Sequence, residues 1–467
     1  MPSKPQSASV LEESGGGVPP VKTWSIGTLT YTSSGLIALF AWLLWGDFTW
    51  SLKERSIGQV LQILLMKFGA SDVLTGFLLG SLPAGIAMFL CPVVGYRSDR
   101  HRGRWGRRIP FILLPTPIVV LAMIGLAYSP ELGTWFHQVC GAHSLGLNGF
   151  TLLFLAFFWV MFAFSGVIIN AVFGALINDV VPTAVLGRFY GAFRALSLAA
   201  GMLFSYWIFG QTEAHYAIIF IGIGLVFGGG LFLMCWKVKE GEYPPPPPAE
   251  PDKGVKGFYE ATRGYMKACF GNSYYLLVFF VLAAPAIAFL PFNLFSIFYA
   301  KSIHMSMDEY GKCNAVMYLI SFSLSYPIGM LADRVHPIRL SIIGLAAYGL
   351  ICLWGGFFVR DTVTFIIALF GCGVVVGIWM TATASLPQRL LPAGKFAEYF
   401  SAAGIINCLS QIIIGPVLGV FLDSCGHVYR YVFFVGAGLT ALCLWACVVL
   451  HRRFMMLGGP EHYVAPE

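Results

Sequence analysis

The sequence predicts an all-α membrane protein in which twelve transmembrane helices form two pseudo-symmetric six-helix bundles around a central cavity. Of its 467 residues, 57% are hydrophobic and only 11% are charged, whereas about a quarter of the residues of a typical soluble domain are charged. The apolar residues recur in blocks of about 20, the length that a helix needs to cross roughly 30 Å of hydrocarbon. A polar loop motif occurs once in each half of the chain. Because a segment in lipid must satisfy its own backbone hydrogen bonds, these blocks are expected to be helices.

The loops between the apolar blocks indicate how the protein is oriented. Spans are expected at 35–66, 73–95, 109–128, 151–177, 187–209, 216–237, 274–299, 311–332, 338–358, 363–386, 397–421 and 430–450. An even number of spans places both termini on one side. The other side has only five basic residues, in loops or at span ends: Lys67, Lys301, Lys312, Arg360 and Arg430. The positive-inside rule therefore predicts cytoplasmic termini, and we expect a multi-pass protein of a bacterial inner (plasma) membrane.

The longest polar stretch separates the two expected bundles. It contains five consecutive prolines, Pro244 to Pro248, which cannot lie inside a helix and indicate a stiff linker. The expected organisation is a disordered cytoplasmic tail at 1–22, an N-terminal bundle at 23–237, a Pro-rich cytoplasmic linker at 238–271, a C-terminal bundle at 272–452 and a cytoplasmic tail at 453–467. The Ser, Gly and Pro of the first 22 residues are typical of a disordered tail and not of a cleavable signal peptide.

Several classes of function are disfavoured by what the sequence lacks. No G-x-S-x-G, P-loop or H-E-x-x-H string occurs, so we do not expect an enzyme. The 11 cysteines lie mostly in apolar blocks, and their spacing indicates neither a metal site nor a disulfide framework. The net charge of +7 comes from short loops, where membrane topology explains it, and does not predict a nucleic-acid partner. The expected partners are a small solute and the lipid bilayer; no cofactor is expected, and the protein is expected to be monomeric.

The repeated loop motif is G-x-x-x-D-R at the cytoplasmic end of the second span of each half. It comprises Gly95, Asp99 and Arg100 in the first half, followed by Arg107 and Arg108, and Gly329, Asp333 and Arg334 in the second. Glycine lets helices approach closely, and an aspartate can face the positive N-terminal end of a helix in the opposite half. We expect a conformational latch of the outward-facing state, with Asp99 near 396–398 and Asp333 near Arg188. The alternative is that Asp99 and Arg100 merely cap span two.

With this motif, the basic run after it and its two six-helix halves, the chain resembles the major facilitator superfamily over residues 24–455. That resemblance implies a secondary transporter that works by alternating access. Three strings are also similar to the glycoside/pentoside/hexuronide symporters and the related sucrose-type carriers: Trp105 to Phe111, Gly46-Asp47-Phe48, and Asn170 to Leu176 followed by Arg194 to Gly201. The resemblance implies that Asp47, Asn170 and Arg194 stand at sugar-contact positions.

The chain departs from that branch where its sodium site would be. Ala87 and Cys91 stand at the places of two sodium-coordinating carboxylates, and Asn170 replaces an aspartate. An amide can hydrogen-bond a hydroxyl group but carries no negative charge. If transport is coupled to a cation, we therefore expect a proton and not sodium, with Glu54 and Asp47 as the proton-coupling residues.

The second half of span one is too polar for a lipid-facing helix. Asp47, Ser51, Glu54, Arg55, Gly58 and Gln62 recur at helical spacing and fall on one face. Charges inside a membrane are costly and mark a substrate or proton path by default. We expect this stripe to line the central cavity together with Arg194 of span five. Two alternatives remain: 51–66 is a surface helix, or Arg194 forms a structural pair with Asp47 or Glu54.

Uncharged polar and aromatic side chains complete the predicted substrate site. Asn170, Asn293, Asn407 and Gln411 supply hydrogen-bonding amides, and Trp50 supplies a flat face. Amides and aromatic rings suit a sugar, which offers hydroxyl groups and a C–H face. A drug/proton antiporter is a second candidate. Such carriers resemble one another in a span five that ends in Gly-Pro, and span five of this chain lacks that ending. A carrier of organic anions such as uronates or nucleosides is a third, favoured by Arg55 and Arg194.

Overall fold

The computed structural model describes residues 23–140, 146–245, 263–392 and 395–466. The first half contains β1 (Trp24–Ile26), β2 (Leu29–Tyr31), α1 (Ser33–Lys67), α2 (Asp72–Gly76), η1 (Phe77–Ser81), α3 (Leu82–Arg100), α4 (Ile109–Leu113), α5 (Thr116–Ala127), α6 (Ser129–Cys140), α7 (Gly146–Val180), α8 (Thr183–Leu203), η2 (Phe204–Ile208), η3 (Phe209–Gln211) and α9 (Thr212–Lys237). The second half contains α11 (Ser273–Leu282), η4 (Pro285–Phe289), α12 (Leu290–Ser302), α13 (Met307–Val335), α14 (Pro337–Phe358), α15 (Thr362–Thr383), α16 (Leu386–Leu390), α17 (Phe396–Ser424), α18 (Tyr431–Met456) and α19 (Gly459–His462).

The helices account for the twelve predicted crossings. By length and apolar composition alone, ten described helices qualify as spans, or up to eleven if a bent pair counts as one. One of the ten, Thr183–Lys237, is 55 residues long. Its two ends lie at the same face, because Asp179 before α8 and Glu240 after α9 both bind Arg107. That stretch therefore holds two crossings, α8 and α9. The run of α11, η4 and α12 makes the remaining, broken crossing.

The two faces of the protein can be distinguished by the helix ends that meet there. At one face α1 begins, α3 ends and α18 ends; we call it the termini face. At the other, α2 begins and α17 ends, and Asp72 contacts Asp423; we call it the far face. Both G-x-x-x-D-R motifs end their helices, α3 and α13, at the termini face, as predicted from the repeat.

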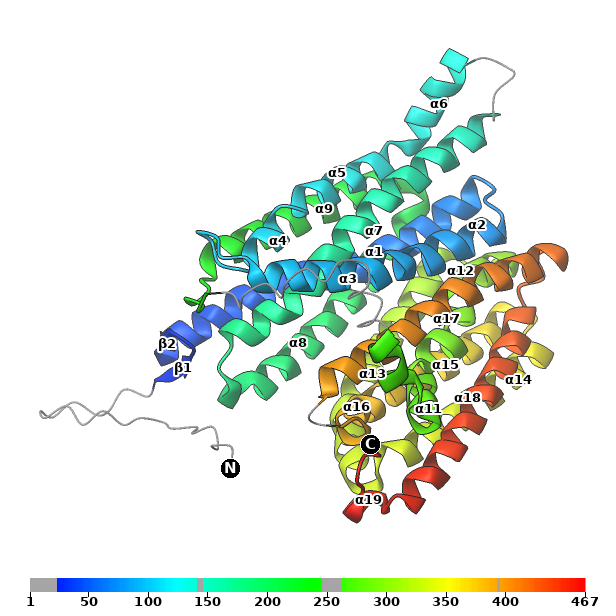
Figure 1. Cartoon of the computed structure of the whole chain (residues 1–467). Helices are drawn as coiled ribbons and strands as arrows, with labels where there is room; N and C mark the ends of the chain where they lie inside the picture. The colour runs from blue at the N-terminus through cyan, green and yellow to red at the C-terminus, as the bar shows by residue number, and fades with distance from the viewer. Residues whose placement is uncertain (1–22, 141–145, 246–262, 393–394, 467) are drawn as a thin grey trace, which may run out of the picture.

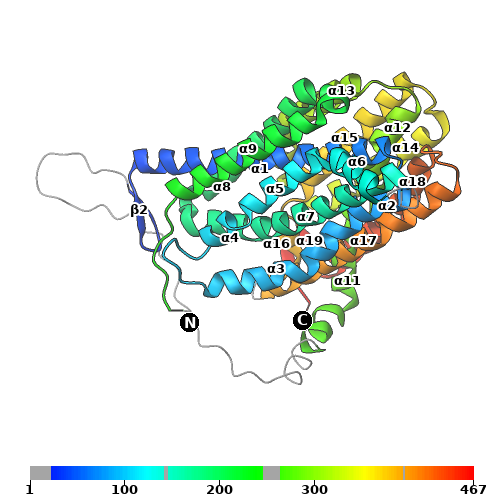
Figure 2. The same cartoon turned by 90° about the horizontal axis from the view of Figure 1, so that it is seen from above.

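The two bundles touch each other along their far-face halves. Figure 1 shows the blue-to-green first half and the green-to-red second half meeting at α2 and α17 and diverging toward α8 and α16. Helices α3 and α17 lie side by side in Figures 1 and 2. The other main contacts between the halves join α13 to α8, η2 and η3. Among the described residues, the hydrogen bonds between the halves lie in the middle and far-face parts of the helices, for example Ser81 to the carbonyl of Ile412 at 2.8 Å.

Glycines bring α2 and α17 into close contact. A Cβ atom at Gly415 would lie 2.5 Å from the carbonyl oxygen of Gly76, and one at Gly419 would lie 2.4 Å from that of Asp72. Real Cβ atoms do not approach so closely. Small residues permit such backbone contact between membrane helices, where packing replaces the hydrophobic effect as the source of stability. We call Gly76, Gly415 and Gly419 the glycine seam.

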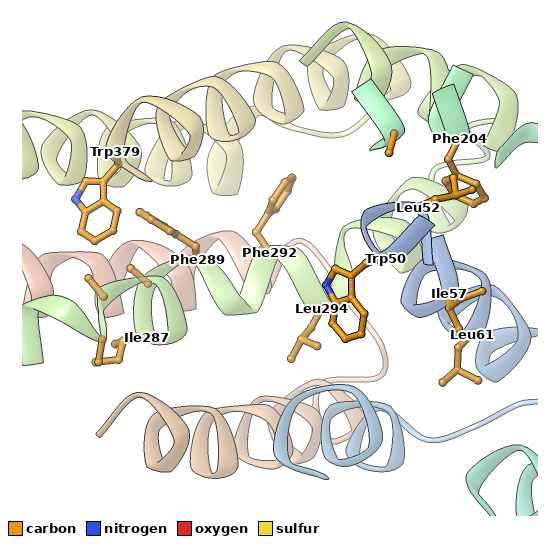
Figure 3. Packing of buried hydrophobic residues seen from close by; sticks show 14 of the residues in the cluster. Trp50, Leu52, Ile57, Leu61, Phe204, Ile287, Phe289, Phe292, Leu294 and Trp379 are labelled. Atoms are coloured by element: carbon orange, nitrogen blue, oxygen red, sulfur yellow. The ribbon is translucent and has the colours of Figure 1, made fainter. Parts of the chain in front are cut away.

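Each bundle has its own aromatic core. In the first half, Trp50 of α1 packs against Phe173 of α7 and Phe227 of α9, with ring centroids 6.4 and 6.1 Å apart. In the second, Phe289 meets the indole of Trp379 edge-on at 5.5 Å. Figure 3 shows these two tryptophans among buried leucine, isoleucine and phenylalanine side chains. The packing fixes the faces that α1 and α12 turn toward the interface between the bundles.

Three sequence-based expectations can be compared with these elements. Helix α1 runs unbroken from Ser33 to Lys67, so 51–66 is not a separate surface helix. Span three was expected to end at 128, but helix continues as α6 to Cys140. The predicted linker contains helix at Arg263–Phe270, bent by 84° from α11; its central part, 246–262, and the tail 1–22 lie outside the described residues.

Candidate functional site

The polar stripe of α1 lies within the bundles and not on a separate helix. Thr32 caps the helix by accepting a hydrogen bond from the Gly35 amide, and the 35 residues that follow contain no proline. Asp47 is fully buried. Its Oδ1 accepts a hydrogen bond from Ser51 at 3.2 Å, while its Oδ2 has no hydrogen-bond partner. An unpartnered buried carboxylate oxygen is costly and is stabilised by any proton or cation that reaches it.

Lys53 occupies an aromatic box inside the first bundle. Its Nζ lies 3.7 Å from the ring centroid of Trp50 and 5.0 Å from that of Phe162, and the side chain is 1% exposed. A lysine over aromatic faces gains about 0.5–2 kcal/mol from cation–π attraction. The same Nζ lies 2.8 Å from the Glu54 carboxylate. Glu54 itself is 62% exposed, so one end of this ion pair is buried and the other is open.

Arg55 connects the two bundles at the middle of the interface. Its guanidinium donates to the hydroxyl of Ser197 on α8 at 3.0 Å and lies 5.0 Å from the ring centroid of Tyr318 on α13. Gly201 of α8 makes room for it, since a Cβ there would lie 2.6 Å from the arginine Cδ. Helices α1, α8 and α13 therefore meet around one cation.

Arg194 joins this group from α8. It is exposed and lies near Arg55 and Tyr318, and its side chain makes no hydrogen bond or ion pair with another described residue. The alternative of a structural pair with Asp47 or Glu54 is therefore not formed in this conformation. We call Asp47, Lys53, Glu54, Arg55 and Arg194 the central cluster. It has three cationic side chains against two carboxyl groups, and only Lys53 and Glu54 are within ion-pair distance.

The uncharged candidates are distributed over both bundles. Asn170 and Asn293 are exposed, and Asn407 and Gln411 are half-buried. Asn293 and Gln411 also contribute backbone carbonyls, which accept from Gln62 and Ser81 respectively at 3.5 Å. These amides remain candidate ligands.

Trp50 is 8% exposed in this conformation and its ring packs within the first bundle, so its contact with a solute stays a prediction. The amphipathic pattern of α1 did not distinguish the cavity face from the face turned to α7 and α9. Trp50 therefore acts on the cluster through Lys53 and offers no open face to a solute in this conformation.

The first G-x-x-x-D-R motif is held within its own half. Arg108 binds Asp99 at 2.5 Å and Ser98 at 2.6 Å, and both Arg107 and Arg108 bind Asp179 at the end of α7. Asp99 makes no hydrogen bond or ion pair with the described parts of Phe396 or Glu398 at the start of α17, so the expected latch contact is not formed there in this conformation. It stays a prediction for the opposite state. Gly329, Asp333 and Arg334 lie in the last turns of α13, and the Asp333 side chain is outside the described part.

Sequence reasoning missed two acidic partners of this loop. Asp179 follows Asn178 at the end of α7, and Glu240 follows α9. The Glu240 carboxylate accepts from the backbone amides of Arg107, Arg108 and Ile109 at 2.7–2.9 Å, and so caps the N-terminus of α4. Burial raises the pKa of the neighbouring Tyr243, so its phenol stays neutral and donates to Glu240 at 3.1 Å. The only sequence signal for these partners was a single acidic residue at the end of each span, Asp179 after span four and Glu240 after span six.

Comparison with known proteins agrees with the fold and the motif. The model of the Major Facilitator Superfamily matches residues 138–414 and 286–457. The chain therefore belongs to the major facilitator superfamily. It is also 23% identical over 392 residues to the lysosomal dipeptide transporter MFSD1 of Mus musculus, covering 81% of this chain and 78% of that protein.

Solved structures of similar fold include transporters of several solutes. A bacterial homologue of the iron transporter ferroportin in an inward-facing state aligns with a TM-score of 0.63 at 16% identity, covering 89% of this chain and 99% of its own. A D-xylose-proton symporter aligns with a TM-score of 0.62 at 14% identity, covering 88% of this chain and 96% of its own. At these identities the likeness supports the fold alone. The chain is thus an integral, multi-pass transporter of this superfamily.

Proposed function

We propose that this transporter carries a small polar solute with a carboxylate group by alternating access, and that a zwitterion of dipeptide size fits it best. The observation that carries the proposal is the central cluster. Among the described residues, the Arg194 side chain has no hydrogen-bond or ion-pair partner, and Arg55 binds a hydroxyl group and an aromatic face but no carboxylate. A guanidinium in a partly dry site gains charge-assisted hydrogen bonds from a carboxylate, worth about 1.5–3 kcal/mol each. The exposed Glu54 is placed to receive a cationic amine. The dipeptide substrate named for the mouse relative supports the same class.

A neutral sugar or glycoside is the second candidate. The exposed amides of Asn170 and Asn293 favour it, together with the half-buried Asn407 and Gln411. The similarity of three sequence strings to the glycoside/pentoside/hexuronide branch also supports it. Hydroxyl groups would satisfy these amides without using the excess positive charge.

Proton coupling is the proposed energy source. Asp47 is a buried carboxyl group with one unpartnered oxygen, and Glu54 connects a buried lysine to the open side. Either carboxyl group could take up a proton when the site changes its access to water. A sodium ion is less suited, because Ala87 and Cys91 of α3 offer no carboxylate.

The orientation of this conformation follows from the distribution of basic loops. With cytoplasmic termini, the contacts between α2 and α17 close the outer side and the protein faces inward. The bacterial homologue of ferroportin that resembles it in fold is also described as inward-facing. We propose a bacterial plasma membrane location and a monomer.

The test is uptake by proteoliposomes of three matched solute sets: dipeptides, uronates and neutral sugars. We expect uptake of carboxylate-bearing solutes, lost in Arg194→Ala because the solute carboxylate loses its partner. Arg360→Ala is the control, since Arg360 is exposed in the loop between α14 and α15, outside the central cluster and the latch residues, and it should keep wild-type affinity. Uptake of neutral sugars alone, with wild-type affinity in a folded Arg194→Ala variant, would favour the second candidate. A pH gradient should stimulate uptake and a sodium gradient should not.

A further inference from the structure

At the far face, four polar side chains join the two halves of the chain. Asp72 belongs to the first half, at the start of α2. Asp423 lies at the end of α17, and His427 and Tyr429 lie in the loop between α17 and α18. We call these four residues the far-face gate. They adjoin the glycine seam, which brings α2 and α17 together.

The contacts of the far-face gate are short and cross from one half to the other. The Asp423 carboxylate accepts from the backbone amides of Asp72 and Val73 at 2.9 and 3.2 Å, so it caps α2 from the opposite half. His427 Nδ1 lies 2.7 Å from Asp72 Oδ2, and the Tyr429 hydroxyl donates to Asp72 Oδ1 at 3.1 Å. The Asp72 side chain is 1% exposed, whereas that of His427 is 55% exposed. The buried anion is thus bound to a titratable group that water can reach.

We infer that the far-face gate is proton-dependent: a proton on His427 holds the gate closed, and loss of that proton releases it. The Asp72–His427 contact exists only when the two halves are together, so opening separates a buried carboxylate from an imidazole. A neutral imidazole can still hydrogen-bond Asp72, but it cannot neutralise the charge. Breaking the charged pair therefore costs more than breaking the neutral one.

The direction of the pH effect follows from the environment of His427. The hydrogen bond to Asp72 raises the pKa of His427 above its ordinary value, although burial opposes this. Opening returns the imidazole to water and an ordinary pKa of about 6.5. The closed gate therefore binds the proton more tightly than the open gate. Acidification on the far side favours closure, and the extra stability is lost as the pH rises through the raised pKa.

The charged surroundings support a proton and not a metal ion as the ligand. The titratable groups that face His427 are Asp72 of α2, Asp423 of α17 and Tyr429; α12 contributes only Phe298 to the adjacent pocket. The oxygens of both aspartates are already engaged by backbone amides, the imidazole or the phenol. A cation here must replace bonds that hold the halves together, whereas a proton strengthens them.

The backbone conformation at His427 allows substitution by asparagine without added strain. His427 has a φ of 59°, in the left-handed region that asparagine tolerates better than most residues. His304, in the far-face loop between α12 and α13, has a φ of 61° and is exposed, and its imidazole makes no hydrogen bond with a described residue. His427→Asn and His304→Asn therefore impose the same chemical change, inside and outside the gate.

Two native cysteines can report on gate opening in the full-length protein in nanodiscs. Cys425 is half-buried beside the gate, and Cys140 is exposed at the end of α6. The rate of labelling by a polar maleimide, expressed as the ratio of Cys425 to Cys140, cancels the intrinsic effect of pH on thiols. We expect this ratio to rise between pH 5 and pH 8 in the wild type, by up to about tenfold for each unit by which the two pKa values differ.

The variants decide the inference. His427→Asn and Asp72→Asn should each abolish the pH dependence and raise the ratio at pH 5 toward its value at pH 8, and His304→Asn should behave as the wild type. Wild-type pH dependence in a folded His427→Asn or Asp72→Asn variant would overturn the inference, as would a wild-type ratio that does not change with pH. The inference rests on alternating access but not on the solute. Gate behaviour as expected, with no uptake of any tested solute, would refute only the proposed substrate class.

Discussion

The far face and the termini face use the same physical device in opposite ways. At each face a carboxylate caps a helix N-terminus, where unpaired amides and the helix dipole stabilise negative charge. At the far face Asp423 caps α2 of the other half. At the termini face Glu240 caps α4 of its own half, and Asp99 is held by Arg108 of its own half.

The difference teaches how one fold can close either end. Carboxylates that cross between the halves close a face, and carboxylates satisfied within one half leave a face free to open. When the conformation changes, each of these carboxylates then exchanges one hydrogen-bond partner for another and is not left without one. The glycine seam lies beside the crossing carboxylate, and its close backbone contact brings Asp423 within reach of α2.

The largest effect is expected from filling the glycine seam. In Gly415→Val, the Cβ position lies 2.5 Å from the backbone oxygen of Gly76, which cannot move aside like a flexible side chain. Overpacking of this kind typically costs about 1–3 kcal/mol. The cost falls on the closed state alone, so the Cys425 to Cys140 labelling ratio should be high at every pH.

Gly404→Val on the same helix is the matched control. A Cβ at Gly404 meets nothing within 4 Å. Its labelling ratio should remain that of the wild type. A low ratio in a folded Gly415→Val variant would show that the seam does not hold the far face closed.

A smaller effect is expected from removing the cap that crosses between the halves. Loss of a capping aspartate costs about 0.5–2 kcal/mol. Asp423→Ala should destabilise the conformation with the closed far face by this amount and so raise the Cys425 to Cys140 labelling ratio several-fold. Asp361→Ala removes a cap that α15 receives from its own half, where Asp361 accepts from the Thr364 amide at 2.9 Å. It should lower the melting temperature to a similar extent with no change in labelling; equal labelling of the two variants would contradict the comparison.

Much of the fold could be predicted because its signals are local. Apolar blocks give the spans, the G-x-x-x-D-R repeat gives the two halves, and the spacing of polar residues gives the stripe of α1. The Lys53 box could not be predicted, since Phe162 and Phe227 reach it from α7 and α9. The far-face gate joins Asp72 to His427, 355 positions apart in the sequence, and no spacing rule connects them. The charged residues Asp47, Glu54 and Arg55 were predicted from the spacing along one helix, but their partners depend on packing between helices.

The smallest effect is expected from Asp99→Asn. The direction of its change in the Cys425 to Cys140 labelling ratio tests the predicted latch. In this conformation the Asp99–Arg108 pair is half open to water, with Asp99 58% exposed, so its contribution to stability is about 0–1 kcal/mol. Asp99→Asn should therefore leave the melting temperature almost unchanged. If Asp99 caps the start of α17 when the termini face closes, as the repeat predicts, the substitution destabilises the opposite state instead. The population then shifts toward a closed far face, and the labelling ratio should fall below the wild-type value at pH 8, where the proton no longer holds the gate. An unchanged or higher ratio would mean that Asp99 serves only the loop of its own half.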